Sequence, residues 1–146
     1  LAWHSKDVRL LLGRAQARGE FHDYLGALKD FRAAFAFASQ NTHVLNEYAW
    51  FLATCPDDGV RDGKRALELA RKAVVEAPGP EAGLYDTLAA ALAECGRFEE
   101  AADIQKKALA LAENNGYPKD LLEAWRERYG MYKLNMPYRQ HADNAH

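Results

Sequence analysis

The sequence contains few cysteines, no long apolar run and no excess of basic residues. Two cysteines among 146 residues exclude a disulfide-rich secreted scaffold. No stretch of about 18 apolar residues occurs, so we expect no membrane-spanning helix. Lysine and arginine together number 19 against 21 aspartates and glutamates, which gives a net charge of −2. Because proteins that bind nucleic acids normally carry a basic excess or patch, we expect no nucleic-acid partner.

Residue patterns that mark catalytic or metal centres are also missing. The five histidines occur at no recognisable metal-ligand spacing. The chain has no Cys-x-x-Cys pair, no glycine-rich phosphate loop and no nucleophile-elbow motif. The loop 57–62 superficially resembles a calcium-binding loop, but it lacks the alternating oxygen ligands and the closing glutamate. We therefore expect no catalytic residues, no cofactor and no metal, and we do not expect an enzyme.

The residues that are abundant favour helix. The chain is rich in Ala, Leu, Glu, Lys and Arg and has few β-branched residues, a composition that favours helices over strands. Turn signals occur at Gly19, 56–63, 78–80, Gly96 and 114–118. Between them lie segments of roughly 12 to 16 residues, which suit short amphipathic helices. The sequence therefore predicts an all-α fold.

Prolines and one aspartate predict individual helix boundaries. Pro56 disfavours helix at Cys55, so a helix should end there. Asp62 is predicted to cap the start of the next helix, because its side chain can accept from a free backbone amide. Pro80 and Pro118 are predicted to be the first residues of later helices, where the missing amide hydrogen costs nothing.

Alanines recur at regular intervals and reveal an internal repeat. The alanines predicted to open successive second helices are Ala27, Ala66 and Ala101, and those found seven residues later are Ala34, Ala73 and Ala108. The two intervals are 39 and 35 residues, and the first becomes close to 34 once the five extra residues 55–59 are left out. A period near 34 is typical of a helical hairpin repeat.

The third unit shows which repeat this is. Its residues at the diagnostic positions are Tyr85, Leu88, Ala89, Leu92, Gly96, Phe98 and Ala101. This pattern resembles the tetratricopeptide repeat family. The unit departs from the family at Gln105, where an aromatic residue is usual, and at Glu113, where proline is usual. In the second unit, the segment 52–73 is similar to a loop-expanded version of the repeat that is common in bacterial arrays.

The resemblance implies a single domain over residues 1–146, built as an α–α superhelix. Its parts are expected to be three helical hairpins, at roughly 6–40, 43–78 and 82–113, and a capping helix with a tail at 117–146. Small residues let paired helices approach to about 8–10 Å, and the expected close contacts are Ala49 with Ala66 and Ala89 with Ala101. Leu121, Trp125 and Tyr129 recur every four residues and are predicted to form the buried face of the capping helix.

The family resemblance implies recognition of a protein or peptide. The first helices of such hairpins line a concave groove that holds an extended or helical peptide. The residues expected to line it here are Arg14, Arg18, Asn46, Glu47, Trp50, Thr54, Asp86, Ala90 and Glu94. A helix turns by about 100° per residue, so Trp50 is rotated away from the core stripe of Ala49 and Leu52 and is predicted to be the centre of the groove. The Lys and Asn clamp with which some family members hold a terminal carboxylate is not evident.

Three functional hypotheses stay open at this point. The first is an adaptor or scaffold that binds a peptide in its groove. The second is a segment of a larger chain in which the repeats position or regulate an attached enzyme. The third is self-association through a carboxyl-terminal aromatic cluster, since exposed aromatic clusters mark interfaces. Its members are Trp125, Tyr129, Met131, Tyr132, Met136 and Tyr138, with Trp125, Tyr129 and Tyr132 as its main residues. The sequence leaves the partner and the compartment undecided.

Two further expectations concern the start of the sequence and the cysteines. Residues 1–3 look like the end of a preceding helix and Ser5 like the N-cap of the next, so we expect the chain to be the carboxyl-terminal piece of a longer array. Cys55 and Cys95 occupy equivalent places in successive units, and neighbouring helices lie about 8–10 Å apart. A disulfide needs Cα atoms within about 7 Å, so both thiols are predicted to be free.

Overall fold

The computed structural model describes residues 2–141, with side chains from Asp7 onward, and this part of the chain consists of helices joined by turns and loops, with no strand. Its seven helices are α1 (Ala2–Glu20), α2 (Tyr24–Phe37), α3 (Thr42–Thr54), α4 (Gly63–Glu76), α5 (Ala82–Glu94), α6 (Phe98–Asn114) and α7 (Lys119–Lys133). The predicted all-α class is confirmed. None of these described helices is long and apolar enough to cross a bilayer.

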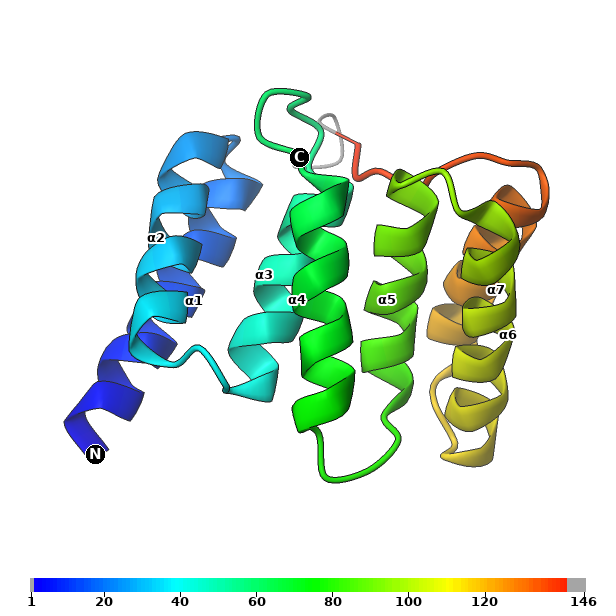
Figure 1. Ribbon diagram of the computed structural model, residues 1–146, viewed down its shortest axis with the longest axis horizontal. Coiled ribbons are helices and arrows are strands. Elements are labelled where there is room, and N and C mark those ends of the chain that lie inside the picture. The colour runs from blue at the N-terminus through cyan, green and yellow to red at the C-terminus, as the bar shows by residue number, and fades with distance from the viewer. Residues whose placement is uncertain (1, 142–146) are drawn as a thin grey trace.

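The helices pack as sequential antiparallel hairpins (Figure 1). Helix α1 pairs with α2, α3 with α4 and α5 with α6, and α7 packs against α6 as a single last helix. Helices α2, α4 and α6 form the nearer layer of Figure 1, and α1, α3 and α7 lie behind them. The second and third hairpins contact each other through both α3 and α4 against α5. The first hairpin contacts the second chiefly where α2 meets α3, which leaves room between α1 and α3.

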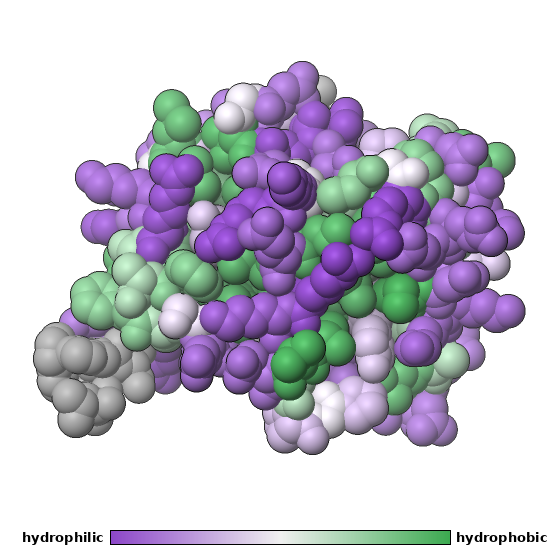
Figure 2. Space-filling view, in the orientation of Figure 1, coloured by the Kyte–Doolittle hydropathy of each residue, from purple (hydrophilic) through white to green (hydrophobic). Residues whose placement is uncertain are grey.

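Alanine at the repeating positions allows this close packing. The repeat alanines Ala27, Ala34, Ala66, Ala73, Ala101 and Ala108 are all buried, as are Ala49 and Ala89 in the first helices. Side chains this small let helices approach closely, and the larger core residues Phe31, Leu45 and Leu69 fill the space around them. Large hydrophobic side chains that are exposed, such as Leu10 and Leu25, gather over the first hairpin, where Figure 2 shows hydrophobic surface.

Side-chain caps begin three of the helices. Asp23, Asn41 and Asp62 accept hydrogen bonds from the backbone amides of Gly26, Val44 and Arg65 at 3.0, 3.1 and 3.0 Å. The predicted cap at Asp62 is therefore confirmed. The predicted end of a helix at Cys55 is also confirmed, because α3 stops at Thr54 and Pro56 follows its cap residue.

Three predicted helix boundaries are wrong. Helix α5 begins at Ala82 after the cap residue Glu81, so Pro80 lies outside it. Pro118 is itself the N-cap residue of α7, with an extended ψ of 146°. Proline is tolerated at a cap for the same reason as at the first helical position, because neither position needs an amide hydrogen. Ser5 lies inside α1, which is continuous from Ala2, because none of the neighbouring residues breaks a helix. Leu1 lies outside the described residues.

Four helices end in a tight left-handed turn. The residue with positive φ is His22 after α1, Gly96 after α5, Gly116 after α6 and Asn135 after α7. At α7 the amide of Asn135 donates to the carbonyl of Tyr132 and that of Met136 to the carbonyl of Met131, at 3.0 and 2.9 Å. This is the Schellman arrangement, and it reverses the chain direction at the end of a helix. It turns the segment after α7 back toward the other helices.

The buried face of α7 differs from the predicted one. Leu122, Trp125 and Tyr132 are buried, whereas Leu121 is 38% exposed and Tyr129 is half-buried. A strict four-residue repeat drifts by about 40° at each step around a helix of 3.6 residues per turn. The buried stripe of Leu122, Trp125, Arg128 and Tyr132 therefore follows steps of three, three and four residues rather than four alone.

Candidate functional site

A cleft of about 460 Å³ separates the first hairpin from α3. Its apolar wall consists of five aromatic residues, Tyr24, Phe31, Trp50, Phe51 and Tyr138. Tyr24 and Phe31 belong to α2, Trp50 and Phe51 to α3, and Tyr138 to the segment that follows α7. The cleft thus lies where the first hairpin has few contacts with α3, and the carboxyl-terminal segment forms part of its wall.

The rim of the cleft is polar and carries two acidic residues. Gln16 on α1 donates to Glu47 on α3 at 2.8 Å and bridges the cleft between the two helices. Glu20 lies at the end of α1 and is exposed. His22 follows it and stacks on Tyr24, with ring centroids 5.8 Å apart. An aromatic floor with a carboxylate rim suits a ligand that is apolar in part and positively charged in part.

The segment after α7 lies across the ends of α5 and α3. In Figure 1 it runs from the top of α7 past α5 toward α3. The backbone amide of Gln140 donates to the carbonyl of Thr54, the last residue of α3, at 2.8 Å. That carbonyl belongs to the last turn of a helix, where the helix itself supplies no donor. A peptide segment therefore already occupies this part of the surface.

The ring of Tyr138 contacts both an aromatic ring and a guanidinium group. Its ring centroid lies 5.8 Å from that of Trp50. The Arg128 guanidinium lies 5.2 Å from the Trp50 centroid and 5.0 Å from the Tyr138 centroid. Both distances are within the range of cation–π attraction, which strengthens as the cation loses water. Arg128 is buried, so the two rings replace part of its hydration.

A buried polar network fixes Arg128 from behind. Its Nη2 donates to both carboxylate oxygens of Asp86 at 2.9 Å, and Nε donates to one of them at 3.2 Å. Gln105 donates to Asp86 at 3.0 Å and to the Trp125 carbonyl at 3.2 Å. Burial raises the pKa of the Asp86 carboxyl, and the charge of Arg128 opposes that rise. Gln105 thus has a polar role at the position where the family pattern has an aromatic residue.

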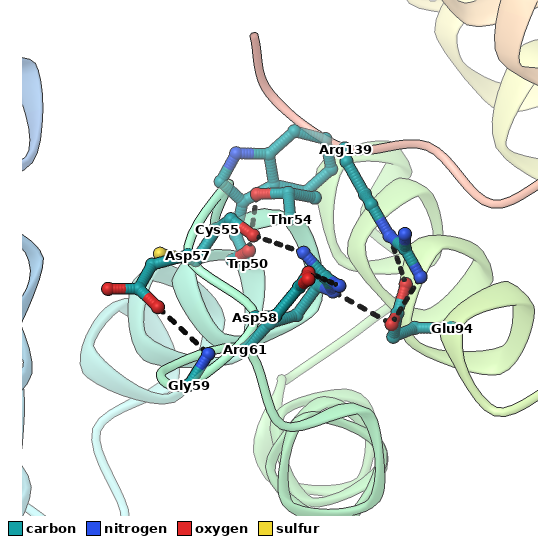
Figure 3. Close-up of polar contacts among 9 residues, drawn as sticks. All are labelled: Trp50, Thr54, Cys55, Asp57, Asp58, Gly59, Arg61, Glu94 and Arg139. Atoms are coloured by element: carbon teal, nitrogen blue, oxygen red, sulfur yellow. Dashed lines mark hydrogen bonds and ion pairs between the residues drawn. The ribbon is translucent and has the colours of Figure 1, made fainter. Parts of the chain in front are cut away.

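A second ion-pair network holds the same segment at α5. Glu94 accepts from Nε of Arg61 at 2.8 Å and from Nη2 of Arg139 at 3.0 Å (Figure 3). Arg61 also donates to the Cys55 carbonyl at 2.8 Å and pairs with Asp58. The loop that connects α3 to α4 and the carboxyl-terminal segment therefore share one carboxylate on α5.

The carboxylates of the loop 57–62 have local structural partners. Asp57 accepts from the Gly59 amide at 2.8 Å, Asp58 pairs with Arg61, and Asp62 caps α4. Within residues 7–141 no group of three or more His, Cys, Asp or Glu side chains is placed to hold a metal ion. The loop is a hydrogen-bonded turn.

The two predicted groove residues of the first hairpin, Arg14 and Arg18, both bind the carboxylate of Asp30. Arg14 donates to Asp30 at 2.8 and 2.9 Å, and Arg18 donates to the same carboxylate at 3.1 Å. Asp30 is buried, and the hydrogen bond from Arg14 lowers the pKa of its carboxyl. Both arginines therefore link α1 to α2, and their side chains are only partly available to a ligand.

The structure places the other predicted groove residues in several different environments. Glu47 and Trp50 line the cleft, and Glu94 lies on the surface that the carboxyl-terminal segment covers. Asn46 is half-buried, and its side-chain oxygen has no hydrogen-bond partner among the described residues. The side chains predicted in the groove but buried are Thr54, Asp86 and Ala90.

Two of those three side chains, Asp86 and Ala90, belong to α5, and their burial has a common cause. Ten of the 13 residues of α5 are buried, because α3, α4 and α6 all pack against it. Because α5 is covered on nearly every side, it has no exposed face, and the rotation of a residue about the helix axis cannot predict that its side chain lines a groove. Asp86 and Ala90 are therefore interior residues, and the hydroxyl of Thr54 donates to the Trp50 carbonyl at 2.7 Å.

The predicted interface of aromatic residues also lies inside the molecule. Trp125 is 4% and Tyr132 1% exposed, so self-association through them does not fit the structure. The Tyr132 hydroxyl is buried without a hydrogen-bond partner among residues 7–141, and burial raises its pKa well above the usual range. These side chains pack α7 onto the third hairpin, as does the partly buried Tyr129.

Sequence reasoning missed the carboxyl-terminal segment as part of the site. Tyr138 was expected in the aromatic cluster considered for self-association, Gln140 in the tail and Arg128 in the capping helix, and none of them in the groove. The available signal was an aromatic residue beside an arginine in a segment with no helical pattern. Comparison with known protein families, with characterised proteins and with solved structures found no match for this chain.

Proposed function

We propose that this protein is a recognition module that binds an extended peptide of a partner protein between its first hairpin and α3. The proposal includes a relationship to tetratricopeptide repeats. It is supported by the alanine period near 34, by the buried alanines at equivalent positions of successive hairpins and by the hairpin order. The relationship to this family is proposed from the repeat pattern alone, since the comparisons with known proteins found no match.

One observation carries the proposal: a peptide segment of the chain itself already lies on this surface. The amide of Gln140 bonds to the end of α3, and Tyr138 stacks on Trp50. Main-chain bonding combined with an aromatic contact is how extended peptides are commonly recognised. Among the described residues, the segment forms part of the wall of the cleft, and a volume of about 460 Å³ lies beside it.

The partners of the acidic residues support binding in this proposal. Asp30 and Asp86, which carry buried carboxylates outside the cleft, are both paired with arginines in structural networks. At the rim of the cleft, Glu20 is exposed and Glu47 accepts a hydrogen bond from the side-chain amide of Gln16. Such groups recognise charge. We therefore propose a partner peptide with apolar and basic side chains.

A peptide library displayed on phage tests this function with the full chain. We expect selected peptides whose binding to Trp50→Ala is at least about tenfold weaker, because an aromatic anchor at the centre of an interface contributes strongly. Val75→Ala is the matched control, since Val75 is 80% exposed on α4 and lies outside the cleft. Selection of no peptide, or of peptides that bind Trp50→Ala as well as the wild type, would contradict the proposal.

A further inference from the structure

We infer that residues 137–140 are an internal ligand of this recognition surface, and that the partner peptide that displaces them carries an aromatic residue followed directly by a basic one. The inference deepens the proposed function and rests on it. It names the chemistry of the partner and a competitor within the chain. Three independent contacts of the segment carry it, one for each part of a peptide: an aromatic side chain, a charged side chain and the backbone.

The aromatic contact is made to a preformed receptor. Trp50 and Arg128 form a notch whose two members are each fixed by other parts of the fold. Asp86 holds Arg128 with three hydrogen bonds, and Trp50 packs against the core. Tyr138 adds its ring to the notch and is only half-buried there. A receptor that is ordered without its ligand binds any suitable ring at low entropic cost.

The charged contact is made to a carboxylate that stays in place without the segment. Arg61 is 8% exposed and keeps Glu94 oriented from the side of the loop. Arg139 binds the same carboxylate from the solvent side and is 46% exposed. Glu94 therefore presents an acceptor to whichever basic side chain follows the aromatic one. An arginine or lysine of another peptide can take the place of Arg139.

The backbone contact requires no particular side chain. The amide of Gln140 reaches the Thr54 carbonyl, which lies at the end of α3. Any residue other than proline supplies such an amide. Together the contacts define a short pattern of aromatic residue, basic residue and a third residue with a free amide.

The same contacts make the segment easy to displace. Arg139 and Gln140 are exposed, and the segment follows directly on the turn at Asn135. The segment is a ligand tethered to its own binding surface, so its local concentration there is high although each contact is weak. The apparent affinity for an external peptide is therefore the intrinsic affinity multiplied by the fraction of molecules in which the segment is released. The carboxyl-terminal segment acts as an internal inhibitor.

Fluorescence anisotropy with a labelled peptide of residues 134–141 provides the test. The full chain is compared with the double variant Tyr138→Ala/Arg139→Ala, which loses the internal ligand. We expect the peptide to bind the double variant at least about tenfold more tightly than the wild type. Lys133→Ala is the matched control, because it lies just before the segment and leaves Tyr138 and Arg139 unchanged; it should bind like the wild type. Equal affinity for the wild type and the double variant would overturn the inference.

Variant peptides test the chemistry of the pattern. Replacing the tyrosine of the peptide by alanine, or its arginine by glutamate, should reduce binding to the double variant by at least about tenfold. A glutamate peptide that binds as tightly as the original would overturn the assignment of a basic residue. Circular dichroism melting of the double variant within a few degrees of the wild type shows that the fold is retained.

Hydrogen exchange in the wild-type chain gives a second, independent readout. The Gln140 amide should be protected in the free protein and should exchange faster when saturating peptide is added. A bound peptide that leaves this exchange unchanged occupies another surface and overturns the inference. If phage selection instead yields Trp50-dependent peptides without the aromatic–basic pair, this inference fails and the proposed function stands. If no Trp50-dependent peptide exists, the proposed function itself fails.

Discussion

Asp86 on α5 and Arg128 on α7 form a two-oxygen ion pair between residues that lie 42 positions apart in the chain. The two side chains are 9% and 10% exposed. The pair joins the third hairpin to the last helix. The same guanidinium also contacts the rings of Trp50 and Tyr138, so one ion pair supports both the fold and the proposed recognition surface.

Removing one member of this pair should be costly. Asp86→Ala leaves the buried charge of Arg128 without its counter-ion, and we expect a loss of about 3–5 kcal/mol in the free energy of unfolding. Glu113→Ala is the control, because its pair with Arg126 is half-exposed and contributes about 0–1 kcal/mol. Urea titration measures both. Similar losses in the two variants would show that the Asp86 pair is not the stronger one.

Replacement of Trp50 separates a binding role from a core role. Trp50 is half-buried and packs against the core with one side, so Trp50→Ala should cost about 2 kcal/mol in unfolding free energy. Phe31→Ala, at a side chain that is 3% exposed, should cost about 3–5 kcal/mol. Denaturant unfolding compares the two. A loss at Trp50 equal to that at Phe31 would make Trp50 mainly a core residue.

The thiols should differ in reactivity and not in oxidation state. Cys55 is buried and Cys95 exposed, both free, and they cap the ends of α3 and α5 at equivalent positions as the repeat predicted. Desolvation raises the pKa of both thiols. Thiol titration of the denatured, unreduced protein should count two, and in the folded protein only Cys95 should react quickly. A rapid reaction that persists in Cys95→Ser would contradict this assignment.

Acid should remove the contribution of Asp30. The hydrogen bond from Arg14 lowers the pKa of the Asp30 carboxyl below its usual value of about 4, so the folded state binds fewer protons than the unfolded state near that pH. The stabilisation is complete above the unfolded pKa and is lost as the pH falls through the folded pKa. Urea unfolding of the wild type and Asp30→Asn between pH 6 and pH 3 should show a stability difference that shrinks toward low pH. A constant difference would argue against the ion pair.

Two glycines of the third hairpin should respond oppositely to alanine. At Gly96 and at Gly83 an added Cβ meets nothing within 4 Å. Gly96 has φ of 77° in the turn after α5, so Gly96→Ala should destabilise by about 1 kcal/mol through backbone strain. Gly83 is helical within α5, so Gly83→Ala should stabilise by about 0.5–1 kcal/mol. Thermal melting of the two variants measures the sign of each change.

Local and periodic features were predictable from the sequence. The caps at Asp62 and Cys55 depend on residues adjacent to the helix ends, and the alanines are constrained by the distance between paired helices. These causes act over a few residues or repeat regularly. They need no knowledge of which helix lies beside which.

The candidate site was less predictable because its causes are not local. Asp86 was expected at the surface, and its burial depends on Arg128 and Gln105 from two other helices. Tyr138 belongs to a segment with no periodicity. Its position depends on the turn at Asn135 and on its contacts with Trp50 and Arg128. Pattern analysis of a single helix contains neither kind of information.

The contact between Gln140 and Thr54 has a consequence for the order of events during synthesis. Each hairpin joins helices that are neighbours in the chain, and such local contacts form rapidly. Folding during translation proceeds from the amino terminus, so α3 and its neighbours can be in place before the ribosome releases residues 137–140. A nascent chain therefore passes through a period in which the surface beside Trp50 is uncovered. Residues 137–140 cover this surface only after they have been synthesised.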